Sequence, residues 1–119
     1  MFNNVKIGDK TVPMLSMASV DVFYRNIFHE DPMKLQMETE DAGALINFHT
    51  RMAFIMAKYA ECHDRKEMAK LNEDSFLDWL DQFDRMDLMA ALEDVMKTYN
   101  GQALTASEAK KNTEEPSDK

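Results

Sequence analysis

Apolar residues recur at helical spacing along most of this chain, and the longest such stretch runs from Thr39 to Lys70. It contains no Pro and a single Gly. Its apolar positions fall mostly three or four residues apart: Leu45, Phe48, Met52, Ile55, Met56, Tyr59 and Cys62. The pattern predicts one helix of roughly 30 residues, about 45 Å long, with Thr39 as its N-cap. The shorter elements are expected to pack against this helix.

Two shorter helical segments are predicted before this central helix. Residues 19–29 carry five apolar side chains on one helical face, and Ser19 is a candidate N-cap. Asp31 followed by Pro32 favours a short helix that reaches Met37, because Pro suits the first helical position and Asp can cap it.

Two further helices are predicted after the central one. Asn72 is a suitable N-cap for residues 73–83, and Asp84 is a suitable N-cap for residues 85–99. Both segments carry a broad apolar face. The Asn-Gly pair that ends at Gly101 favours a helix stop there.

A small β-hairpin is predicted at residues 4–14, where apolar and polar residues alternate around Gly8 and Asp9. Pro13 cannot donate a hydrogen bond, so its strand is expected at a sheet edge. An isolated hairpin is marginally stable in water. The hairpin is therefore expected either to pack on its own domain or to pair with another subunit or a partner.

The expected fold class is mainly α: one helical domain over residues 1–101, built around a long central helix, with the small N-terminal hairpin. Beyond Leu104 no apolar side chain larger than Ala occurs, apart from Pro116, while charged and hydroxyl residues accumulate. Residues 102–119 are therefore predicted to form a disordered tail.

The chain has 119 residues, a net charge of -8 and a pI near 4.8. Nucleic-acid binding depends on Lys and Arg that neutralise phosphates, so a nucleic-acid partner is not expected. The acidic residues gather between residues 73 and 94, where eight of them accompany one basic residue, Arg85. Most of these carboxylates are expected on solvated helix faces rather than in a catalytic cleft.

Cysteine and methionine usage adds two expectations. The single cysteine, Cys62, cannot form an internal disulfide, and neither a signal peptide nor a membrane-spanning run is recognisable, which favours a cytosolic protein. Eleven residues are Met, whose flexible side chain either fills gaps in a core or forms an adaptable partner surface.

No sequence motif for catalysis or cofactor binding is present: HExxH, P-loop, GxGxxG, GxSxG and CxxC are all missing. His63 and Glu67 stand four residues apart beside Cys62 and form a weak candidate metal pair, although polar side chains on a surface or at an interface explain the same spacing better. The sequence therefore favours an interaction protein rather than an enzyme, with no cofactor and no metal.

Three segments, in this order, resemble the tail assembly chaperones of long-tailed phages and prophages of Gram-positive bacteria: residues 23–32, 53–58 and 76–83. The first reads Phe-Tyr-Arg-Asn-Ile-Phe-His-Glu-Asp-Pro, the second Ala-Phe-Ile-Met-Ala-Lys and the third Phe-Leu-Asp-Trp-Leu-Asp-Gln-Phe. The resemblance covers about residues 18 to 100. In that family Gly is usual where this chain has His29.

The resemblance implies a mostly helical protein, absent from the finished virion, that coats the tape measure protein in the host cytoplasm. It keeps that protein soluble until tail tube subunits polymerise around it, and it is expected to self-associate. The family also implies a programmed frameshift near the C-terminus. The run Lys110, Lys111, Asn112 can be encoded by a slippery heptamer.

The candidate site residues fall into two groups. The partner-binding candidates are Phe76, Trp79, Phe83, Met86 and Met89, of which Trp79 is either core or hot spot. The candidates for fold determinants in the family motif are Tyr24, Arg25, Phe28 and Asp31. Arg25 is expected to pair either with Asp21 or with Asp31.

Two alternative functions remain open from the sequence. The first is a small acidic regulatory module that binds a basic protein through residues 73–94. The second is a helical metal enzyme built on His49, His63 and carboxylates.

Overall fold

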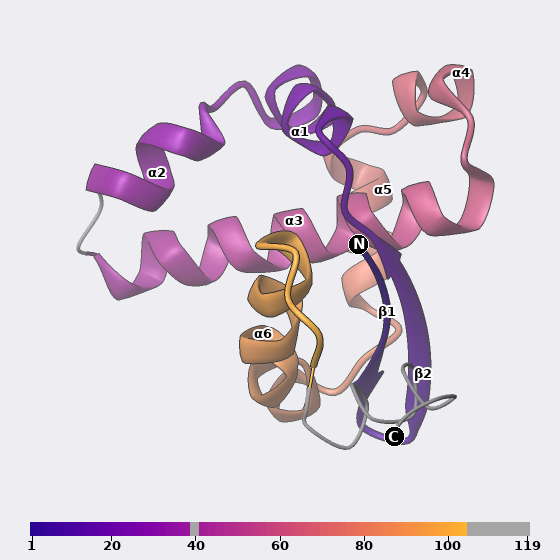
Figure 1. The fold of residues 1–119 in the computed structure, drawn as a ribbon, viewed down its shortest axis with the longest axis vertical. Helices are drawn as coiled ribbons and strands as arrows, with labels where there is room; N and C mark the ends of the chain where they lie inside the picture. Colours follow the sequence, from indigo (N-terminus) through magenta and orange to yellow (C-terminus); the bar gives the residue numbers. More distant parts are fainter. Residues whose placement is uncertain (39–40, 105–119) are drawn as a thin grey trace, which may run out of the picture.

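The computed structural model describes residues 1–38 and 41–104, and helix α3 runs through its centre (Figure 1). The described part of the chain forms β1 (Phe2–Ile7), β2 (Lys10–Leu15), α1 (Ser19–Phe28), α2 (Pro32–Glu38), α3 (Ala42–Cys62), α4 (Arg65–Ala69), α5 (Glu73–Leu80) and α6 (Arg85–Tyr99). Helix α3 packs against β2 and against all five other helices. The fold is mainly helical with an N-terminal hairpin, which confirms the predicted class.

The elements lie on two sides of α3 (Figure 1). Helices α1 and α2 lie on one side, while α6 and the hairpin lie on the other. Every residue of α3 from Met52 to Ala57 is buried, so this section is covered all round rather than along one stripe. None of the described helices, α3 included, is long and apolar enough to cross a membrane.

The prediction of one helix over residues 39–70 is wrong, because the chain turns at His63. This residue takes a left-handed backbone conformation (φ 48°), and its N–H donates to the Tyr59 carbonyl, which closes α3. The Asp64 carboxylate then accepts from the Lys66 N–H at 2.8 Å and starts the separate helix α4. The 21 residues of α3 span about 31 Å at 1.5 Å per residue.

The start of α3 also differs from the prediction. Its N-cap is Asp41, whose carboxylate accepts from the Gly43 and Ala44 N–H groups at 2.9 and 3.4 Å. Thr39, the predicted cap, lies outside the described residues, and the helix begins at Ala42. Thr39 and Asp41 are both residue types that cap helices and stand two positions apart, and Asp41 is the one that caps α3.

Strands β1 and β2 form the predicted hairpin, which is slightly longer than residues 4–14. Gly8 has φ 65°, a left-handed value that suits Gly at the first position of a two-residue turn. Alternate β1 side chains at Asn3, Val5 and Ile7 are buried. One face of the hairpin therefore packs on its own domain, against α3 and α6.

Helices α1 and α2 occur where the sequence predicted them, with one difference in capping. The N-cap of α1 is Ala18, which has no side-chain capping bond, and Ser19 is the first helical residue. Helix α1 ends at His29, which is left-handed with φ 59°. The Asp31 carboxylate accepts from a main-chain N–H in the first turn of α2 at 3.0 Å, and that helix begins at Pro32 as predicted.

The predicted caps of α5 and α6 are confirmed. The Asn72 side chain accepts from the Ser75 N–H at 3.0 Å, and the Ser75 hydroxyl accepts from the Asn72 N–H at 3.2 Å, which completes a capping box. The Asp84 carboxylate caps α6. Helix α5 ends at Leu80, three residues before the predicted end at Phe83.

The chain after α6 returns to the hairpin. Gly101 has φ 80° and ends the helix as predicted. The Gln102 carbonyl accepts from the Asn3 side chain at 3.0 Å, and the Leu104 carbonyl accepts from Lys97 at 3.3 Å. Leu104 is buried, so the prediction that a disordered tail begins at residue 102 is wrong: residues 102–104 pack on the domain. The rest of the predicted tail, residues 105–119, lies outside the described residues.

Candidate partner-binding site

The five residues predicted to bind a partner do not form one exposed patch. Phe76 and Trp79 are only 8% and 5% exposed and belong to the core. Phe83 and Met89 are partly buried against that core. Met86 is 63% exposed and is the one member of the set that lies open.

A groove of about 570 Å³ lies between β2, α3 and the end of α5, and two of the five residues line it. The rings of Trp79 and Phe83 meet edge to face, with centroids 4.9 Å apart. Val12 and Pro13 of β2 and Ala57 of α3 complete its apolar lining. The apolar pattern of the helices did not predict the contribution of β2, although Pro13 on an edge strand was a signal for it.

Both lysines of the groove already have partners. Lys10 donates to the Gln82 carbonyl just beyond α5, and its ammonium lies 5.3 Å from the centroid of the Phe83 ring. Lys58 lies 3.4 Å from the Glu61 carboxylate. The groove therefore combines an apolar floor with two lysines that already interact with other groups of the protein.

Tyr24 and Phe28, two of the predicted fold determinants, hold α1 against α3. The fully buried Tyr24 donates from its hydroxyl to Glu30 Oε1 at 3.0 Å, and Arg51 of α3 donates to the same oxygen at 2.7 Å. The Arg51 guanidinium lies 4.9 Å from the centroid of the Phe28 ring. Burial, and then the hydrogen bond to Glu30, raise the pKa of Tyr24 far above its usual range.

The prediction for Arg25 is wrong, since it forms an ion pair with neither Asp21 nor Asp31 within the described residues. Asp21 instead accepts from the Tyr99 hydroxyl at 2.7 Å, which ties α1 to the end of α6. Burial, followed by this hydrogen bond, raises the pKa of Tyr99. Asp31 acts as the cap of α2.

The acidic segment lies on the surface, as predicted. Seven of its eight carboxylate residues are exposed, and Asp94 is partly buried. Within it, the Asp84 side chain caps α6, and Asn72, just before the segment, caps α5. The structure thus gives most of these acids a solvated position on α5, α6 and the turn between them.

The histidines are dispersed. His29 and His63 are exposed residues that end α1 and α3, and burial lowers the pKa of His49 on α3. Among residues 1–38 and 41–104, no group of three His, Cys, Asp or Glu residues could hold a metal ion. The weak candidate pair of His63 and Glu67 gains no third ligand there.

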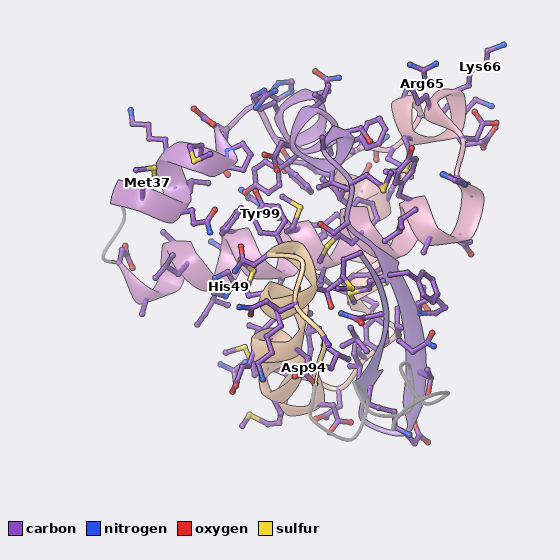
Figure 2. The ribbon with its side chains drawn as sticks, in the orientation of Figure 1. Met37, His49, Arg65, Lys66, Asp94 and Tyr99 are labelled. Atoms are coloured by element: carbon purple, nitrogen blue, oxygen red, sulfur yellow. The ribbon has the colours of Figure 1, made fainter. Side chains whose placement is uncertain are left out.

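Large apolar side chains remain exposed on several elements. They are Met1, Phe2, Met17, Val22, Met33, Met37, Leu77 and Met86. Met37 is 75% exposed and lies at the end of α2 that is remote from the hairpin (Figure 2). Other methionines, such as Met52 and Met56, are fully buried, so Met fills the core in one part of the fold and is exposed to solvent in another.

Comparisons of the chain with protein-family models, curated proteins and solved structures gave no match. The family resemblance therefore remains a prediction from residue pattern.

Proposed function

We propose that this protein is a tail assembly chaperone of a phage or prophage that acts in the host cytoplasm. It binds the tape measure protein, keeps it soluble and helps to recruit tail tube subunits, and it is not part of the finished virion. The resemblance over residues 18 to 100 suggests the family, and the surface chemistry supports the activity.

The observation that carries this proposal is the set of large apolar side chains that the fold leaves exposed. Five of the eight are methionines. Met is unbranched and polarizable, so it can adapt to apolar stripes of varied shape. A chaperone for a long chain with many different apolar segments needs such adaptable contacts more than one rigid pocket.

The acidic surface also supports the proposed activity, because it keeps the unbound protein soluble. A protein that exposes apolar side chains is prone to aggregation. The net charge of -8 on this chain opposes aggregation by repulsion between molecules. A long partner requires many copies of a small chaperone, so ordered homo-oligomerisation is part of the proposal.

Co-expression with the tape-measure-like protein encoded by the same phage or prophage tests this function. We expect the partner to become soluble and to co-purify with this chain. The double substitution of Met33→Gln with Met37→Gln removes two exposed apolar contacts, and burial of a Met is worth about 1.5 to 3 kcal/mol. The variant should therefore lower the affinity at least about tenfold.

A matched control is Lys34→Gln, an exposed substitution on the same helix that introduces the same residue type and removes less apolar surface. Both variants should keep the thermal stability of the parent, because none of these side chains is buried. An insoluble partner in the presence of abundant folded protein would contradict the proposal.

The small acidic regulatory module remains a second candidate function. The observation in its favour is the exposure of seven carboxylate residues between residues 73 and 94. Binding to a Lys-rich protein that is abolished by added salt would support it, because salt screens exposed charges over about 10 Å at 0.1 M.

The proposed frameshift concerns residues outside the described part of the chain. It requires the codons AAA and AAC at Lys111 and Asn112. Other codons at these positions would remove it.

A further inference from the structure

The outer edge of strand β2 carries polar main-chain groups with no partner strand in the described part of the chain. The two-residue turn makes Ile7 and Lys10 a hydrogen-bonded pair, and such pairs alternate with non-bonded pairs along an antiparallel ladder. Counting in twos from Ile7 and Lys10, the pair of Met1 and Ser16 should also be hydrogen-bonded, and these two residues do form main-chain hydrogen bonds in both directions at 2.8 Å. Every second residue of β2, starting from Thr11, therefore directs its polar groups away from β1.

Three residues of β2 form this outward edge. Thr11 and Leu15 each offer an N–H donor and a carbonyl acceptor, while Pro13 offers its carbonyl alone. No hydrogen bond to another described element engages these groups. The edge can therefore accept one more strand, with a gap in the ladder at Pro13.

The groove described above lies against this same edge. Thr11 and Pro13 line it, and Trp79 and Phe83 lie across from them. Side chains of a strand point alternately to its two faces, so a strand laid along β2 would present alternate side chains to this apolar lining. The geometry fits an extended segment with an apolar side chain at the centre.

The charges near the groove specify the flanks of that segment. Lys10 and Lys58 already contact the Gln82 carbonyl and Glu61. Asp78 and Asp81 do not line the groove but adjoin its residues Trp79 and Gln82 in the sequence; both are exposed, and neither forms an ion pair within the described residues. The C-terminal end of a helix also carries negative partial charge. The net charge of -8 on the chain favours Lys or Arg in the bound segment.

We propose that the groove beside β2 binds an extended segment of a partner protein as a third strand of the hairpin sheet. One apolar side chain of the segment packs on Trp79 and Phe83, and a Lys or Arg beside it complements the net charge of -8. The inference deepens the proposed function and rests on it for the identity of the partner, which would be the tape measure protein.

Two other occupants fit the groove less well. Pairing of two β2 edges would place Pro13 of both copies in one ladder and bring together two chains of net charge -8. The segment 105–119 of this chain has no apolar side chain larger than Ala except Pro116, so it has little with which to fill an apolar floor.

The test uses a displayed library of random peptides of about ten residues, longer than an average strand. We expect the enriched peptides to share an apolar residue next to Lys or Arg. Thr11→Pro removes one outward donor and leaves the ladder to β1 intact, so it should weaken their binding about three- to tenfold. Pro13→Thr adds a donor at the gap and should tighten binding by a similar factor.

Thr11→Val is the matched control, because it changes the exposed side chain and keeps the main-chain N–H. It should bind the peptides like the parent, and all three variants should keep the parent's circular dichroism spectrum. The inference is overturned if no peptide is enriched, or if folded Thr11→Pro binds the enriched peptides as well as the parent does.

The same variants separate this inference from the proposed function. Intact peptide binding without solubilisation of the tape measure protein would overturn the proposed function and leave the groove assigned. Solubilisation that is unaffected by Thr11→Pro and Pro13→Thr would overturn the inference alone. Peptide binding that strengthens on deletion of residues 105–119 would assign the groove to that segment. A dimer that forms through β2 in place of peptide binding would assign the groove to a second copy. Either result would overturn the inference as well.

Discussion

Substitution of Tyr24 by Phe removes one oxygen atom from the buried junction between α1 and α3. The Tyr24 hydroxyl donates to Glu30 Oε1 at 3.0 Å, and Arg51 donates to that same oxygen at 2.7 Å. Phe retains the ring that packs edge to face on Phe48, with centroids 5.6 Å apart. The change therefore isolates one hydrogen bond from the packing around it.

The magnitude follows from the surroundings of the Glu30 carboxylate. A hydrogen bond to a charged group contributes about 1.5 to 3 kcal/mol. The Glu30 side chain is 40% exposed and keeps its bond to Arg51, so the low end of that range applies. We expect the free energy of unfolding to fall by about 1.5 kcal/mol and Tm by roughly 5 to 10 °C.

Urea unfolding followed by the fluorescence of Trp79, the one tryptophan of the chain, measures this change from a core position. The control is Tyr59→Phe, because the Tyr59 hydroxyl forms no hydrogen bond within the described residues, and it should cost less than about 0.5 kcal/mol. The reasoning is refuted if the two variants lose equal stability. It is also refuted if Tyr24→Phe costs as much in a Glu30→Ala background as in the parent.

Three further predictions use the same unfolding assay. Gly8→Ala should lower the free energy of unfolding by more than about 1 kcal/mol, because Gly8 has φ 65° and an added Cβ would displace the Asp87 carboxylate; an unchanged value would contradict this. Asn72→Ala should cost about 1 kcal/mol through loss of the capping box, and Ser75→Ala should cost less. Burial lowers the pKa of His49, so the unfolded chain binds a proton more readily than the folded protein. Stability present above about pH 6.5 should therefore fall as the pH drops below that value, and His49→Asn should fall less steeply over the same range.

Local sequence signals predicted much of this fold. Asn72 and Asp84 cap the helices they were expected to cap, and Pro32 begins α2. Gly8 forms the hairpin turn. Each of these features depends on residues only a few positions apart, whose backbone preferences are strong enough to act without help from the rest of the chain.

The break after α3 shows where such signals mislead. The apolar positions continue at helical spacing through Cys62, so periodicity alone extends the helix. Asp64 is a good N-cap in principle, yet a capping residue in the middle of a periodic stretch does not reveal whether the helix stops before it. In the structure the left-handed backbone of His63 ends α3. The sequence has no Gly at this position, so the usual signal for such a helix end was missing.

The candidate site could not be predicted from local signals, because it is formed by contacts between distant parts of the chain. The groove combines one strand with parts of two helices, and the bond from Asn3 to the Thr98 hydroxyl joins residues 95 positions apart. Helical periodicity predicted that Trp79 and Phe83 lie on an apolar face. It gave no means to tell that Trp79 is almost wholly buried and Phe83 only partly, or that both border a groove, because that depends on which neighbour covers each side chain.

The salt dependence of binding to the tape measure protein tests the central claim most directly. Between about 0.1 M and 0.5 M salt, the screening length falls from about 10 Å to a few ångströms. If the exposed methionines and the groove beside β2 supply most of the binding energy, the dissociation constant should change by less than about fivefold over this range. A loss of affinity of about a hundredfold would contradict this account and favour an acidic module that binds through residues 73–94.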